Sequence, residues 1–214
     1  MSSDRDPVVS AVDVAVRATL AGKHPEAEAA LADIVVSRPS QDTSALVAPQ
    51  GETGRTGPRQ TRKTVPVAVQ MALFRRDNFT CRYCGRQTLF TPLVRLLSGL
   101  YPATLPYHPH GKFGMGHLLY WTHTASIEHV VAVAAGGSND PENLITACYG
   151  CNDQKSDWPL ERLGWRVNPP ATVSWDGLSD SYPALYVWCS TEHGQVESVS
   201  YHSAWLRAVP GSHR

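Results

Sequence analysis

Two Cys-x-x-Cys pairs constrain the fold of this 214-residue chain more than any other feature. The first pair is Cys81 and Cys84, the second is Cys148 and Cys151, and the fifth cysteine, Cys189, is expected to be a buried apolar residue. Four thiolates in two such pairs suit a tetrahedral Zn²⁺ ion in a closed structural site, which leaves no position for chemistry. The alternatives are independent reduced cysteines or, in a secreted protein, disulfides.

The second pair lies in a stretch, residues 127–157, that is rich in groups able to bind a metal. Residues 127–134 are rich in β-branched side chains and predict a strand, and a glycine-rich loop follows at 136–140. A short second strand is predicted at 143–145, and a short helix is predicted to start near 149–151. The predicted unit is therefore strand, loop, strand, helix.

Three side chains of this unit carry candidate chemistry. Glu128 and His129 are adjacent in the first strand, so they are expected on opposite faces unless the strand twists or bulges. Asn152 lies in the first turn of the predicted helix. Carboxylate and amide oxygens suit Mg²⁺ or Mn²⁺, and a neutral His129 can take a proton from water near pH 7. The alternative is a surface strand with an ordinary histidine and loop-bracing asparagines.

These residues resemble the HNH, or ββα-metal, endonucleases. In that family an Asp-His or related pair opens the motif, an asparagine follows a glycine-rich loop, and a His or Asn lies on the helix; Glu128-His129, Asn143 and Asn152 occupy those places. The resemblance implies hydrolysis of DNA phosphodiester bonds, with His129 as general base and Asn143 as the asparagine that braces the loop. It also implies a catalytic Mg²⁺ or Mn²⁺ ion held by Asn152 near Glu128.

One position departs from the family pattern. Glu128 stands where many members have Asp, and its extra methylene moves the carboxylate by about a bond length, which is on the order of the tolerance of catalytic geometry. A second function therefore stays open: a catalytically inactive, zinc-stabilised module that binds nucleic acid or protein.

The resemblance covers about residues 65–165, including a helix and first cysteine pair like those that precede many zinc-bearing HNH motifs. The expected class is α+β, with a ββα-metal core, a structural zinc site, a helical N-terminal appendage and a C-terminal extension. The expected organisation is as follows: 1–36 helical appendage, 37–64 flexible basic linker, 65–168 HNH nuclease domain with an insert at 86–126, and 169–214 C-terminal extension packed on the core.

Outside the motif, helical patterns predict a helical hairpin within 6–36 and single helices at 65–78, 91–100, 158–165 and 201–208. Residues 105–112 of the insert are irregular and rich in histidine and aromatic side chains. Here His108, His110 and Lys112 either touch phosphate, stack on a base, or fix an irregular loop through hydrogen bonds.

Positive charge is concentrated in one part of a chain whose formal net charge is zero. Residues 51–90 hold eight Lys and Arg against two Asp and Glu, a net charge of +6. Such a patch can neutralise phosphates locally. The predicted DNA contacts are Arg75, Arg76, Arg82, Arg86 and Lys155. The basic residues at 55–63 are either further contacts or part of a solvated linker.

The sequence also limits where the protein acts. It has no apolar run long enough to span a membrane and no signal peptide, so we expect a cytoplasmic protein without a membrane partner. DNA is the expected partner. A protein partner, if there is one, is expected at the N-terminal helices.

Overall fold

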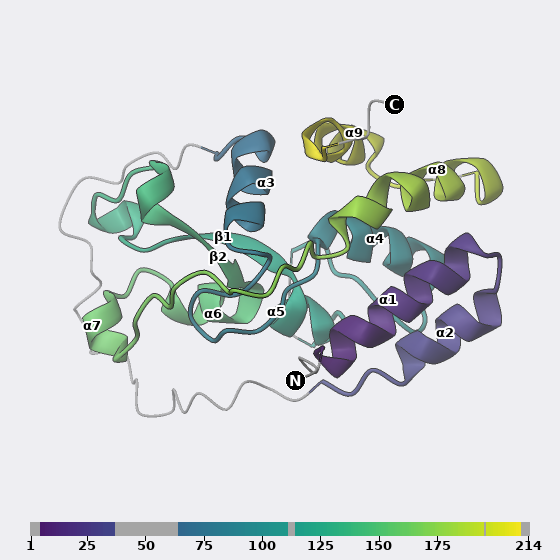
Figure 1. Cartoon of the computed structure of the whole chain (residues 1–214), viewed down its shortest axis with the longest axis horizontal. Helices are drawn as coiled ribbons and strands as arrows, with labels where there is room; N and C mark the ends of the chain where they lie inside the picture. Colours follow the sequence, from purple (N-terminus) through teal and green to yellow (C-terminus); the bar gives the residue numbers. More distant parts are fainter. Residues whose placement is uncertain (1–4, 37–63, 111–113, 195, 211–214) are drawn as a thin grey trace.

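The computed structural model of the chain describes residues 5–36, 64–110, 114–194 and 196–210. The basic segment at 55–63 therefore lies outside the described residues. Figure 1 shows a largely helical side and a side that carries a small β-hairpin with helices α6 and α7. The helices are α1 (Pro7–Leu20), α2 (His24–Ala32), α3 (Val67–Arg76), α4 (Thr91–Leu100), α5 (Leu119–His123), α6 (Tyr149–Lys155), α7 (Leu160–Leu163), α8 (Tyr182–Glu192) and α9 (Val199–Ala208).

The two strands, β1 (Ala125–His129) and β2 (Leu144–Cys148), form an antiparallel sheet that leads directly into α6. This arrangement confirms the predicted α+β class and the order strand, loop, strand, helix. The first strand was expected at 127–134, and that prediction was wrong at both ends. Beyond His129 the side chain of Asn143 bonds both the backbone N–H and the carbonyl of Val131, which a neighbouring strand would otherwise use.

The main hydrophobic core lies on the helical side. Helix α1 contributes Val9, Val12 and Val16, all fully buried, to a cluster that it shares with α4, α8 and α9. Asp6 caps α1 by accepting from the Val8 N–H at 2.9 Å, and its other oxygen lies 3.1 Å from His123 Nε2 at the end of α5. The N-terminal helices are thus built into the core and joined to the element that precedes β1.

The insert supplies part of the same core. Helix α4 spans the predicted 91–100, and its residues Leu93, Val94 and Leu97 are fully buried. At its start, Phe90 packs edge-on against Tyr182 of α8 and Trp205 of α9, with ring centroids 5.1 and 5.2 Å apart. The C-terminal residues therefore pack on the core through aromatic contacts.

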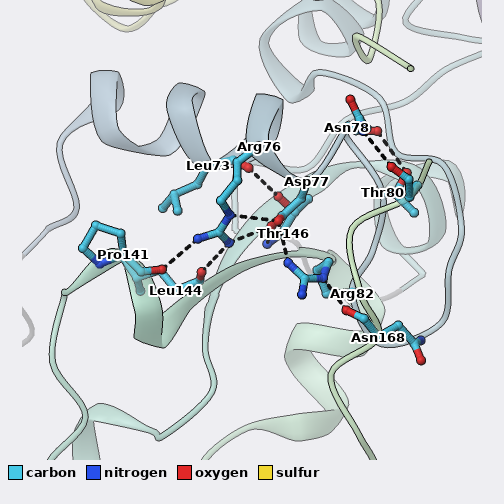
Figure 2. A network of polar contacts seen from close by, with 11 residues as sticks. Leu73, Arg76, Asp77, Asn78, Thr80, Arg82, Pro141, Leu144, Thr146 and Asn168 are labelled. Atoms are coloured by element: carbon cyan, nitrogen blue, oxygen red, sulfur yellow. Dashed lines mark hydrogen bonds and ion pairs between the residues drawn. The ribbon is translucent and has the colours of Figure 1, made fainter. Parts of the chain in front are cut away.

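A buried carboxylate joins the end of α3 to β2. Asp77 has no exposed surface; it accepts from Arg76 at 2.9 Å, from Arg82 at 2.7 Å and from the Thr146 N–H at 2.8 Å, as Figure 2 shows. Burial alone raises the pKa of Asp77, but the hydrogen bonds from Arg76, Thr146 and Arg82 together hold it below its ordinary value. Arg76 also donates to the Leu144 carbonyl at 2.7 Å. The network therefore fixes the strand that leads to the second cysteine pair.

Within the described part of the chain, no helix has both the length and the apolar character needed to cross a bilayer.

Candidate metal centre and catalytic cavity

The four cysteines of the two pairs meet in space. Their Sγ atoms, from Cys81, Cys84, Cys148 and Cys151, all lie within 4.8 Å of one another, and none is in a disulfide. Sulfurs about 2.3 Å from a tetrahedral Zn²⁺ ion lie roughly 3.8 Å apart, so the cluster has the size and donor set of a zinc site. Among the described residues, this is the only group of three or more His, Cys, Asp or Glu whose ligand atoms converge in this way.

Backbone hydrogen bonds shape the first pair and attach it to the second. The Gly85 N–H donates to the Cys81 carbonyl at 2.9 Å, in a turn where Gly85 has φ of 75°. The Arg82 N–H donates at 2.9 Å to the carbonyl of Thr146, two residues before Cys148 on β2. The thiols of Cys148 and Cys151 hydrogen-bond to Cys84 and lower its pKa. The fold thus brings the two pairs together as a unit.

A separate polar cavity of about 340 Å³ lies between β1 and α6. It is lined by Glu128, His129, Ala132, Val133, Asn152, Asp153, Ser156 and Asp157. We refer to it as the catalytic cavity, after the role that the sequence predicts for three of these residues. The three side chains expected to carry chemistry, Glu128, His129 and Asn152, all line it. Glu128 and His129 both line this cavity although they are neighbours in β1.

His129 is held in one tautomer by a residue that the sequence reasoning missed. Its Nε2 lies 2.8 Å from Oδ1 of Asn139, an oxygen that only accepts hydrogen bonds. In the neutral ring Nε2 therefore carries the proton and Nδ1 has the lone pair, which is the tautomer able to accept a proton from water at Nδ1. Asn139 follows the glycines of the loop, where its residue type is equally suited to a turn.

The two other asparagines fix the loop and the helix. Asn143 Oδ1 accepts from the Val131 N–H at 2.8 Å, and its Nδ2 donates to the carbonyls of Val131 and Ser138 at 3.0 and 2.8 Å. Asn152 Nδ2 donates at 2.9 Å to the carbonyl of Ile127 on β1. Since its nitrogen faces β1, the Oδ1 atom of Asn152 is the side-chain oxygen able to ligate a cation.

Lys155 has a different environment from the one expected. It has no exposed surface, and its Nζ lies 2.9 Å from Oε1 of Glu128, whose side chain is 5% exposed. The prediction that Lys155 contacts DNA is therefore wrong, because an enclosed ammonium group paired with a carboxylate cannot reach a phosphate backbone. The sequence placed Lys155 on a polar helix and gave no sign that this face is covered.

The four predicted arginine contacts all have partners within the fold. Arg76 and Arg82 hold Asp77, Arg75 pairs with Asp180 at 2.7 Å, and Arg86 donates to the Thr122 carbonyl at 3.3 Å. Arg82 is the most enclosed of the ion-paired arginines, with 12% of its side chain exposed. Arg76 and Arg82 thus stabilise the framework around the metal centre, while DNA contact by the four arginines stays a prediction.

Comparison with known proteins gives a match to a protein family. The family model described as HNH endonuclease matches residues 117–157, which include β1, β2 and α6. No curated protein and no solved structure matches the chain significantly. Residues 117–157 are therefore similar to the HNH endonuclease family, in a chain whose four clustered cysteines are positioned to bind a metal.

Proposed function

We propose that this protein is a metal-dependent endonuclease that hydrolyses DNA phosphodiester bonds at the catalytic cavity. The observation that carries the proposal is the position of His129. Its imidazole lines the same cavity as the Asn152 amide, and in the neutral ring the contact with Asn139 places the proton on Nε2, so that Nδ1 can accept one. A histidine in this form is suited to the activation of a water molecule near neutral pH.

The chain's own residues then have distinct roles. Nδ1 of His129 takes a proton from the water that attacks the phosphorus, and Asn139 orients the ring through Nε2. Asn143 keeps the loop that carries Asn139 in place through its bonds to Val131 and Ser138. The P–O bond to the 3′ oxygen breaks as the new bond forms, so the products carry a 5′-phosphate and a 3′-hydroxyl.

Two metals with separate tasks fit the donor sets. The four cysteines would hold a structural Zn²⁺ ion, and Asn152 with Glu128 would hold a catalytic Mg²⁺ or Mn²⁺ ion. The acids Asp153 and Asp157 line the same cavity and add negative charge there. When bound, the catalytic ion supplies positive charge that stabilises the phosphate and the leaving oxygen.

The test is a supercoiled-plasmid nicking assay with Mg²⁺. We expect His129→Ala to lower the cleavage rate by about 10²- to 10⁴-fold, the usual contribution of a general base. The matched control is His193→Ala, which removes an exposed histidine beyond the end of α8 and should leave the rate unchanged. Equal cleavage by wild type and His129→Ala would contradict the assigned role.

The alternative, an inactive binding module, draws support from the buried contact between Glu128 and Lys155. That contact occupies one oxygen of the carboxylate expected near the catalytic ion. In this case the protein binds DNA with an affinity that falls steeply with salt, but no divalent ion induces cleavage. The same plasmid assay, run beside a binding titration, distinguishes the two functions.

A further inference from the structure

A second cavity, of about 280 Å³, lies between α5, the start of α6 and residues of the insert that precede α5, among them Tyr107 and His117. Its lining is mainly aromatic and includes Tyr107, His117, Tyr120, Trp121 and Tyr149. We refer to it as the aromatic cavity. Its volume is near the lower end of the range for small-ligand sites, roughly 300–1,000 Å³. A ligand that fits is therefore small and has flat apolar faces.

We propose that the aromatic cavity binds one unpaired base of the DNA strand that is cleaved at the neighbouring catalytic cavity. The inference rests on the proposed function, which it extends by naming the form of the substrate. A base displaced from its stack presents the flat faces and polar edge that such a cavity can accommodate.

The aromatic side chains provide faces on which a base can stack. Trp121 and Tyr149 are in edge contact, with ring centroids 4.9 Å apart and an interplanar angle of 86°. Tyr107 and Tyr120 lie 5.0 Å apart at 50°. Tyr149 is 37% exposed although its neighbours Cys148 and Gly150 are buried. An aromatic residue held at the surface in this way is available to a ligand, and stacking on it tolerates any base.

His117 provides an uncharged hydrogen-bond donor. Its Nδ1 accepts from the Leu119 N–H at 3.2 Å, so the proton of the neutral ring resides on Nε2. Burial lowers the pKa of His117, which keeps the ring neutral at physiological pH. A neutral N–H donor suits the acceptors on base edges, such as purine N7 or pyrimidine carbonyl oxygens.

Tyr107, His108, Gly116 and His117 of the insert line one side of the cavity. The His117 N–H donates at 2.8 Å to the Pro106 carbonyl, which places His117 beside Pro106. At Gly116, which also lines the cavity, a Cβ atom would lie 3.3 Å from both the His108 nitrogen and the Pro106 oxygen. The backbone at Gly116 thus lies too close to the backbone of Pro106 and His108 for a larger residue at position 116 without adjustment.

Helix α6 connects the aromatic cavity with the catalytic cavity. Tyr149 lines the first, and Asn152 and Asp153 line the second. These residues are three and four positions apart, so they lie on the same side of the helix, about one turn or 5.4 Å along its axis. A base stacked on Tyr149 would therefore belong to a nucleotide close to the phosphate that is cleaved.

The test compares two labelled duplexes that differ by one base. Each carries a single-nucleotide bulge, which is adenosine in one duplex and an abasic residue in the other. Binding to the full-length zinc-loaded protein is measured by fluorescence anisotropy in Mg²⁺-free buffer. We expect wild type to bind the adenosine bulge about ten-fold more tightly, as stacking of one base on an aromatic side chain provides. Equal affinities for the two duplexes would overturn the inference.

Variants then assign the preference to the cavity. We expect Tyr149→Ala to bring the ratio of affinities to about one, while Tyr149→Phe, which keeps the ring, retains it. Val187→Ala removes an exposed side chain of α8 outside the cavity lining and should bind both duplexes as wild type does. A ratio unchanged in Tyr149→Ala contradicts the assignment. Adenosine monophosphate that binds as tightly as the bulged duplex would overturn it as well, since the ligand would then be a free nucleotide.

The outcome is separable from that of the proposed function. If wild type prefers the adenosine bulge but does not nick DNA, the base-binding site is supported and the nuclease function is refuted. If wild type nicks plasmid but binds both bulges equally, the nuclease function is supported and the base-binding site is refuted.

Discussion

His129 can accept a proton at Nδ1 when the ring is neutral with its proton on Nε2, and the amide of Asn139 favours that tautomer. We expect Asn139→Ala to lower kcat by about 10- to 100-fold, the range found when a residue that orients a functional histidine is removed. Asn139→Asp should retain more activity, since a carboxylate also accepts from Nε2. Plasmid cleavage at saturating substrate measures both. A wild-type kcat in Asn139→Ala would mean that the tautomer is fixed by something else.

The buried pair of Glu128 and Lys155 concerns stability as well as the site. Lys155→Met removes the ammonium beside a carboxylate that is 5% exposed, and we expect a loss of about 3–5 kcal/mol in the free energy of unfolding. Glu128→Gln combined with Lys155→Met should recover part of this loss, because no buried charge then lacks its counter-ion. Urea unfolding at pH 7 gives the values for both single variants and the double variant. Additive effects in this cycle would show that the two groups are not coupled.

Among the elements, the loop between β1 and β2 depends on a glycine that has no room for a side chain. A Cβ atom at Gly137 would lie 1.7 Å from the Val131 carbonyl oxygen and 2.9 Å from Nδ2 of Asn143. Gly137→Ala should therefore displace the loop that carries Asn139, lowering the cleavage rate and the free energy of unfolding by more than about 1 kcal/mol.

The control for this loop variant is Gly99→Ala in α4. A Cβ atom at Gly99 meets nothing within 4 Å, so the substitution should stabilise the helix by about 0.5–1 kcal/mol and leave cleavage unchanged. Thermal unfolding and plasmid nicking are measured on both. We expect Gly137→Ala to lower the Tm and Gly99→Ala to raise it. A Gly137→Ala variant that is as stable and as active as wild type would contradict the tight fit of the loop.

The contact of α3 with β2 depends on the charge of Asp77. Asp77→Asn leaves the enclosed Arg82 without its carboxylate, and we expect a loss of about 3 kcal/mol in the free energy of unfolding. Asp180→Asn breaks the exposed pair with Arg75 and should cost less than about 0.5 kcal/mol. Denaturant midpoints at pH 7 test the difference. Since the pKa of Asp77 is lowered in the folded state, the gap between wild type and Asp77→Asn should close as the pH falls below about 4.

The sequence predicted those helices and strands whose residue patterns lie within a short stretch of the chain. The β-branched run, the glycine-rich loop and the second cysteine pair predicted the ββα unit, and a regular apolar pattern predicted α4 with its bounds. Helix α8 was missed because its apolar residues surround it: Leu185 and Cys189 are buried, while Val187 is 59% exposed. Such a helix has no apolar stripe to reveal it.

The parts of the site that sequence could not give are set by tertiary contacts. The enclosure of Lys155, the partner of His129, and the pairing of Arg76 and Arg82 with Asp77 all depend on residues brought close by the fold. A basic residue in a charged segment suits phosphate binding and an internal ion pair equally well.

At the scale of the whole molecule, the two sides of the structure have unequal cores. The helical side buries a large apolar cluster that α1, α4, α8 and α9 share. The side with the cysteines has a small cluster of its own: Cys81, Tyr83, Ile145, Ala147, Cys148 and Cys151. Three of its six buried members are proposed metal ligands. Because so little apolar surface is buried there, a bound ion would contribute much of its stability.

This difference in the size of the two cores predicts that metal removal destabilises the side with the cysteines more than the helical side. We expect a zinc chelator at pH 7 to lower the Tm and to abolish hydrogen-exchange protection in β2 and α6, while amides of α1, α4 and α8 keep theirs. Cys84→Ser should reproduce this pattern without chelator and bind less than one zinc per chain. Cys189→Ser lies outside the cluster and should retain one zinc and the protection of β2. Protection in β2 and α6 that survives complete loss of zinc would show that the hairpin folds without a metal.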